Sequence, residues 1–129
     1  MKDKIMVLEL LKNEYSVYKF DPEYVINGNT LTNEFISITR TKDELSIVAQ
    51  ENELNGFLEV ENGWKILKIN GILNFNLVGI LSKISSILAN ENISIFVMST
   101  FNTDFIMVKK KNIKNAMEIL LKNNYEIKG

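Results

Sequence analysis

A polar segment near the C-terminal end of the chain, Thr100 to Asp104, holds the side chains best suited to binding a ligand. It gathers hydroxyls, an amide, an aromatic ring and a carboxylate within five positions. Asn or Asp alone can close a tight turn through side-chain hydrogen bonds to the backbone, so we expect the threonines and Phe101 to face something else. An ordinary hairpin loop remains the alternative interpretation.

Two absent residue types limit the chemistry of the chain. It has no cysteine, which excludes disulfides and thiolate nucleophiles, and no histidine, which excludes the usual general base and metal ligand. The sequence shows no Gly-rich phosphate loop, no metal-ligand cluster and no nucleophile spaced suitably from a base. We therefore expect a protein that is not an enzyme and that uses no cofactor or metal.

Charge and hydropathy also restrict the partners. The formal net charge of −1 argues against the broad basic surface that nucleic-acid binding requires. No apolar run approaches the ~20 residues of a membrane-spanning helix, and charged residues interrupt the N-terminal segment before it could act as a signal sequence. The sequence predicts a cytoplasmic protein that binds neither nucleic acid nor membrane.

The elements that position the polar segment follow from periodicity. Ile93 to Val108 reads as two strands around the polar turn, because both arms are rich in β-branched and aromatic residues. Apolar residues recur at helical spacing from Asn76 to Leu88 and from Ile113 to Leu121, which predicts two amphipathic helices. Residues 64–69 and Tyr125 to Lys128 read as strands.

This order predicts an α+β fold for the second half. The sequence β-α-β-β-α-β is the split βαβ arrangement of ferredoxin-like domains, an antiparallel four-stranded sheet with both helices on one face. Gly79 falls in the first turn of the first helix, where glycine costs ~1 kcal/mol relative to alanine. Either close packing against a strand or room for a ligand would explain it.

The first half is rich in strands and has no long amphipathic helix. Ile5 to Leu11 and Tyr15 to Phe20 suggest one hairpin, and Phe35 to Thr39 with Leu45 to Ala49 a second. We place a boundary in the charged connection that follows, giving an N-terminal subdomain of residues 1–57 and a C-terminal domain of residues 58–129. Because the first half cannot cover both faces of a sheet alone, we expect it to complete the core of the second.

Several segments between about Phe35 and Asn123 are similar to a known family. These segments are SITRTKDELSIVAQE, WKILKING, ILNFNLVGILSKISSILANENIS and IFVMSTFNTDFIMV. They resemble the small bacterial ACT-domain proteins related to the CASTOR arginine sensors of animals, and the most specific parts of the match are STFNTD and NFNLVGIL.

The resemblance implies two ACT-like units in tandem, the first degenerate, in a homodimer that binds a free amino acid at an interface. It places the ligand where the loop before the first helix meets the second strand of a neighbouring unit. The sensors have glycine where this chain has Asn74, so the asparagine side chain could enter the pocket and change or abolish arginine binding. Carried over to this sequence, the ligand-binding residues are Asn74, Phe75, Gly79, Ile80, Ser99, Thr100, Phe101, Thr103 and Asp104.

The chemistry of these residues suits a zwitterion. Backbone amides at the start of a helix favour a carboxylate, and Asp104 suits an ammonium or guanidinium group. Phe75 and Phe101 could wall the pocket and attract a basic side chain. For each residue a plainer role stays open: Asp104 as the cap of a turn, and the two rings as core or dimer-interface residues.

Two functions follow. The first is a regulatory module whose bound amino acid shifts the stability of a dimer or the affinity of a partner. The alternative is a structural or protein-interaction module that keeps the ACT architecture without a ligand, with Asn74 and Phe101 filling the pocket. Isothermal titration against the twenty amino acids distinguishes them.

Overall fold

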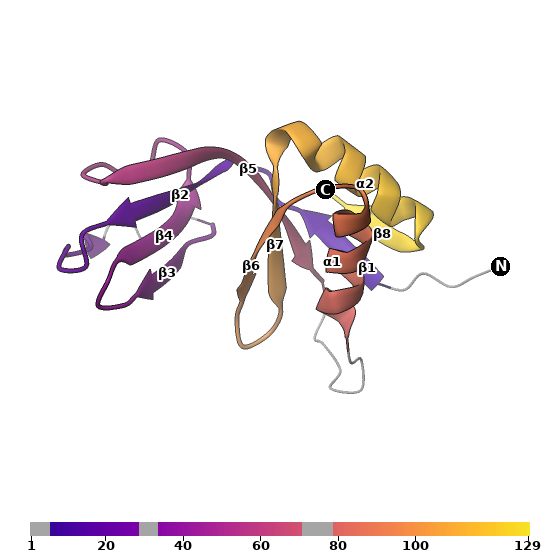
Figure 1. Cartoon of the computed structure of the whole chain (residues 1–129), viewed down its shortest axis with the longest axis horizontal. Coiled ribbons are helices and arrows are strands. Elements are labelled where there is room, and N and C mark those ends of the chain that lie inside the picture. The colour runs from indigo at the N-terminus through magenta and orange to yellow at the C-terminus, as the bar shows by residue number, and fades with distance from the viewer. Residues whose placement is uncertain (1–5, 29–33, 71–78) are drawn as a thin grey trace. The chain divides into compact units, whose positions relative to one another are not determined.

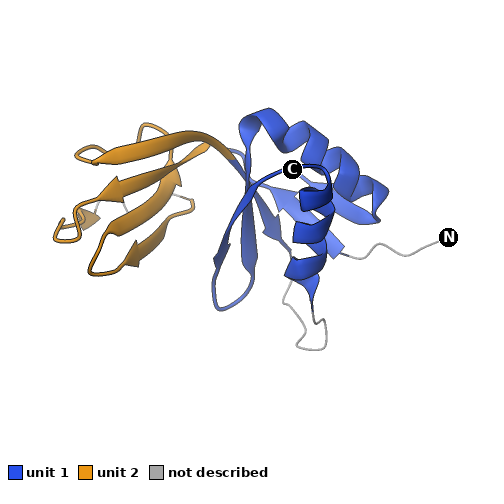
Figure 2. Cartoon of the chain, in the orientation of Figure 1, with its two compact units in different colours: residues 1–12, 65–129 blue, residues 13–64 orange. Residues whose placement is uncertain are grey.

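The contacts within the chain define two units, each built on β-strands. The computed structural model describes residues 6–28, 34–70 and 79–129 (Figure 1). Unit 1 comprises residues 1–12 and 65–129 and unit 2 residues 13–64 (Figure 2). The described elements are β1 (Met6–Leu10), β2 (Tyr15–Phe20), β3 (Ser37–Arg40), β4 (Leu45–Gln50), β5 (Glu59–Ile69), α1 (Ile80–Asn90), β6 (Ile95–Ser99), β7 (Asp104–Lys109), a 3-10 turn (Lys110–Asn112), α2 (Ile113–Lys122) and β8 (Tyr125–Lys128).

Unit 1 is a sheet with two helices packed against one face. Its strand order is β6-β7-β5-β1-β8, where β5 contributes its C-terminal part. Both helices bury their apolar stripes in the same cluster as the sheet residues, and so both cover the same side. The cluster includes Leu67 and Ile69 of β5, Ile84 and Leu88 of α1, and Ala116 and Leu120 of α2. The predicted α+β ferredoxin-like fold is confirmed.

β1 was predicted as a strand, but its place in the sheet, between β5 and β8, was not. It pairs antiparallel with β5, where Leu8 faces Ile69, and parallel with β8, where Leu8 faces Ile127. The predicted four-stranded sheet therefore has a fifth strand between the first and last strands of the βαββαβ unit. MVLEL is almost continuously apolar, and all five of its residues are buried or partly buried.

The predicted hairpin between the first two strands is wrong. β1 neighbours β5 and β8 in the sheet, whereas β2 neighbours β4 and β5. The Leu11 N–H donates to the Ile66 carbonyl at 2.9 Å, which extends the ladder with β5 instead of turning the chain back. The short polar segment 12–14 resembles a hairpin turn in sequence. A connection of the same length can equally well lead the chain from unit 1 into unit 2.

Unit 2 is an antiparallel sheet without an α-helix among its described residues. Its order is β3-β4-β2-β5, with β5 contributing its N-terminal part. The predicted hairpin of residues 35–39 and 45–49 is confirmed, and the Thr41 N–H closes it by donating to the Glu44 carbonyl at 2.9 Å. Unit 2 has its own hydrophobic cluster, which includes Tyr18, Phe20 and Ile47. The first half was expected to complete the core of the second half. Of its described residues, Leu8 of β1 is buried in the core of unit 1.

Candidate functional site

The predicted polar segment is the turn between β6 and β7. These strands pair antiparallel and end with Ser99 opposite Asp104. The Thr100 N–H donates to the Thr103 carbonyl at 2.8 Å, and the Thr100 hydroxyl accepts the Thr103 N–H at 3.3 Å. The Thr100 side chain thus makes the turn bonds that an Asn or Asp was expected to make, so the expectation that its hydroxyl would face something else is wrong for Thr100.

Thr103 also attaches the turn to β5. Its hydroxyl donates to the Ile69 carbonyl at 2.7 Å, and the side chain is buried, with 5% of its surface exposed. Ile69 is the last residue of β5, just before the segment that leads to α1. The Thr103 hydrogen bond therefore holds the polar turn at the end of β5. From this end the chain continues toward α1, whose start contains the other half of the predicted site.

Replacing Thr103 with valine should lower the free energy of unfolding by about 1–2 kcal/mol. The change keeps the shape of the side chain but leaves the buried Ile69 carbonyl without this donor. Denaturant unfolding followed by circular dichroism measures the loss. Thr39→Val, at an exposed position of β3, is the matched control and should change stability by less than ~0.5 kcal/mol. Equal effects of the two changes would show that the Thr103 bond has no structural importance.

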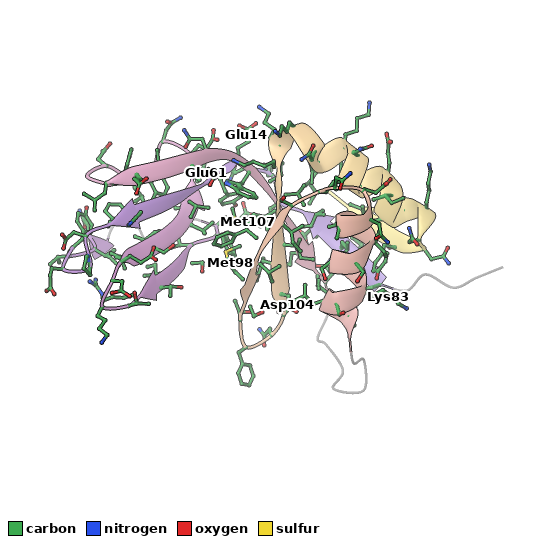
Figure 3. All side chains as sticks on the ribbon, in the orientation of Figure 1. Glu14, Glu61, Lys83, Met98, Asp104 and Met107 are labelled. Atoms are coloured by element: carbon green, nitrogen blue, oxygen red, sulfur yellow. The ribbon has the colours of Figure 1, made fainter. Side chains whose placement is uncertain are left out.

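Asp104 is the first residue of β7 and lies next to the turn of the β6–β7 hairpin (Figure 3). The Ser99 hydroxyl donates to Asp104 Oδ1 across the hairpin. An ionised carboxylate offers about four lone-pair sites on its two oxygens, so this bond orients the group without exhausting it. The pair can present a fixed negative charge to an ammonium or guanidinium group.

Phe101 projects fully into solvent from the tip of the turn. Within one chain its ring therefore walls no pocket. The predicted role of Phe101 in a binding pocket requires a second molecule to cover it.

The start of α1 contains the other half of the predicted site. Asn74 and Phe75 lie outside the described residues, as does the predicted helix start at Asn76. Gly79 precedes the helix with φ of +80°, and no described atom lies within 4 Å of where a Cβ would be placed. The positive φ explains this glycine without close packing. Ile80 packs partly buried against the core of unit 1.

Gly79→Ala should destabilise the protein by ~1 kcal/mol. At this φ the Cβ of an L-residue lies too close to its own backbone. The cost therefore comes from backbone conformation, because no neighbouring atom of the described residues would clash with the added Cβ. Gly28→Ala is the control, because Gly28 also has open space around it and no positive φ is recorded for it. Chemical denaturation of both variants checks the result, and a loss that is equal in the two would refute the conformational explanation.

The described members of the predicted site lie toward one end of unit 1 (Figure 1). Figure 1 shows the β6–β7 turn and the start of α1 at the same end of that unit. A separate open groove of about 550 Å³ runs between the C-terminal half of α1 and the start of β6, and none of the predicted residues lines it. In the described part of the chain, no cluster of acidic side chains could hold a metal ion, and no helix is long and apolar enough to cross a membrane.

The two units carry opposite net charges, which nearly cancel in the formal net charge of −1 for the whole chain. Unit 2 contains ten acidic and three basic residues, a formal net charge of −7, and unit 1 contains six acidic and twelve basic residues, +6. Sequence reasoning used only the total of −1 and so missed this division. A positive unit 1 favours a ligand with a carboxylate at its surface.

Two family models match the chain. Residues 59–122 match the ACT domain, and residues 13–56 match a model for an N-terminal domain. The human protein CASTOR3P is 30% identical over 96 residues, which cover 62% of this chain and 57% of that protein. The chain thus spans just over half the length of this relative.

Solved structures share the fold. The protein Atu0741 from Agobacterium tumefaciens is 29% identical with a TM-score of 0.87, covering 95% of this chain and 91% of that one. The regulatory subunit of aspartate kinase from Thermus thermophilus is 9% identical with a TM-score of 0.63, covering 94% and 98%, and shows the fold alone. Together with the β-α-β-β-α-β order of unit 1, the family-model match over residues 59–122 shows that the chain contains an ACT domain.

Proposed function

We propose that this protein is a cytoplasmic regulatory module that binds a free amino acid at the end of unit 1, as a homodimer. The observation that carries the proposal is the Thr103 hydrogen bond to Ile69, which holds the turn bearing Asp104 at the strand end that leads to α1. This bond supports the proposal that the turn and the start of α1 act together as one site.

The two ends of a zwitterion fit the two halves of this site. Asp104, oriented by Ser99, is the acceptor for the ammonium group. The first turn of α1 has no acidic residue and no side-chain cap, so its backbone N–H groups suit the carboxylate. The net charge of +6 on unit 1 adds attraction for that carboxylate.

A second copy would complete the site. Phe101 is fully exposed in one chain, and a partner covering it would remove an apolar ring from water and close the pocket. A ligand held at such an interface would shift the equilibrium between monomer and dimer, which is how a small molecule would control a partner. The likeness in fold to a regulatory subunit of aspartate kinase supports a regulatory role.

Titration of the full chain with each of the twenty amino acids tests the proposal. We expect one or a few to release or absorb heat on binding, and we expect the same compounds to change the sedimentation of the protein. A flat response to all twenty from a folded dimer would refute it.

The alternative is a structural or interaction module with ACT architecture and no ligand. The engagement of Thr100 and Thr103 in closing and anchoring the turn favours it, because these hydroxyls are committed to the fold. A crystal grown without additives would then show side chains filling the interface, whereas a hydrated pocket would count against it.

A further inference from the structure

Unit 2 contains a pocket of its own, remote in sequence from the predicted amino-acid site. It has a volume of about 180 Å³ and opens between the segment that follows β2 and the connection from β4 to β5. Its floor is apolar and consists of the buried side chains of Phe20, Ile47 and Leu54, with Tyr24 as a wall. This volume lies below the roughly 300–1,000 Å³ of pockets for drug-sized ligands, so the pocket suits only a small ligand.

The aromatic wall is held in place from several sides. The rings of Phe20 and Tyr24 lie with their centroids 4.4 Å apart at an angle of 33°. The Arg40 guanidinium donates to the Tyr24 carbonyl at 2.9 Å and also to the Pro22 carbonyl. On the other side, Tyr24 Cε1 lies 3.5 Å from where a Cβ on Gly56 would be. The pocket is therefore formed before any ligand arrives, which lowers the entropic cost of binding.

The rim of the pocket is polar and acidic. Glu53 and Asn55 are exposed residues that line the pocket, and the Glu53 N–H donates to the Gln50 carbonyl at 3.3 Å, which restrains the backbone of this connection. From sequence alone, Glu53 reads as a solvated charge in a linker. The net charge of −7 on unit 2 repels anions and raises the local concentration of cations.

We propose that this pocket binds a small primary ammonium ion that carries a branched apolar end and no carboxylate. The ammonium group donates to the Glu53 carboxylate and the Asn55 amide oxygen, and the apolar end packs on Phe20, Ile47 and the Tyr24 ring. The parent amino acid is rejected, because its carboxylate would enter a negatively charged unit. This inference does not depend on the proposed amino-acid site.

Three compounds of the same shape test this selectivity on the full chain. The probe is 3-methylbutylamine at pH 7, compared with leucine, which adds a carboxylate, and with 3-methylbutan-1-ol, which lacks the charge. We expect amide chemical shifts around Leu54 in unit 2 to move with the amine and at least tenfold more weakly with the other two. Shifts at Ser99 to Asp104 report the separate site in unit 1, so failure of one proposal is distinguishable from failure of the other.

A matched pair of variants isolates the role of Glu53. Glu53→Gln removes the charge at the pocket and should weaken amine binding about tenfold. Glu59→Gln removes the same charge from unit 2 at an exposed side chain that does not line the pocket and is paired with Lys19 at 3.7 Å, and it should change binding less than twofold. No binding of the amine, equal binding of leucine, or equal effects of the two variants would each overturn the proposal.

Discussion

Replacing Leu8 with alanine is expected to destabilise unit 1 by about 3 kcal/mol, a large part of the stability of a small domain. Leu8 has no exposed surface and lies in the central strand β1, between Ile69 of β5 and Ile127 of β8. Alanine would leave a cavity where the sheet meets both helices. Guanidinium unfolding followed by far-ultraviolet circular dichroism reports on this, because α1 and α2 both belong to unit 1.

The fluorescence of Trp64 gives a separate signal from unit 2, since it is the only tryptophan in the sequence. Ile38→Ala is the control: Ile38 lies on the edge strand β3 with 39% of its surface exposed and should cost less than ~1 kcal/mol. If Leu8→Ala were no more damaging than Ile38→Ala, β1 could not be part of the core of unit 1.

Asp104→Asn should weaken binding of the proposed amino-acid ligand by about tenfold to a hundredfold. A hydrogen bond to a charged group contributes ~1.5–3 kcal/mol, and each ~1.4 kcal/mol is a factor of ten in affinity. Asparagine keeps the shape of the side chain and an acceptor for the Ser99 hydroxyl, so the turn should keep its conformation. Isothermal titration of the variant with the amino acid identified for the wild-type protein measures the change.

Asp43→Asn provides the control for this experiment. Asp43 lies exposed in the turn between β3 and β4 of unit 2, so its substitution removes the same charge from a hairpin turn outside the proposed site. We expect its affinity to stay within twofold of wild type. Unaltered affinity of Asp104→Asn, in a protein with unchanged unfolding, would remove Asp104 from the site.

Local periodicity predicted most elements of the fold. Apolar residues at helical spacing located α2 from Ile113 and the described part of α1, and β-branched residues located the β6–β7 and β3–β4 hairpins. The partner of β1 could not be predicted in this way, because a short apolar strand fits many neighbours. β1 pairs with residues more than fifty positions away in the sequence. Local sequence patterns do not indicate which distant segment a strand will pair with.

The candidate site was predicted less completely than the fold. The sequence located the polar turn, but not that Thr100 and Thr103 close it or that Thr103 anchors it to Ile69, because both features depend on the final backbone geometry. The charge division was hidden for a related reason. Separating the sequence at residue 57 gives formal charges of −4 and +3, whereas grouping residues 1–12 and 65–129, as the contacts do, gives −7 and +6.

The pairing of β1 with β8 also sets the order in which the chain can fold during synthesis. Met6 faces Tyr125, so the first described strand to leave the ribosome must wait for the last one before its ladder is complete. Unit 2 is continuous in sequence and can form earlier. Contacts of such high sequence separation slow folding and leave apolar strand edges exposed in the nascent chain. We expect the MVLEL segment to be the part of this protein that chaperones bind during translation.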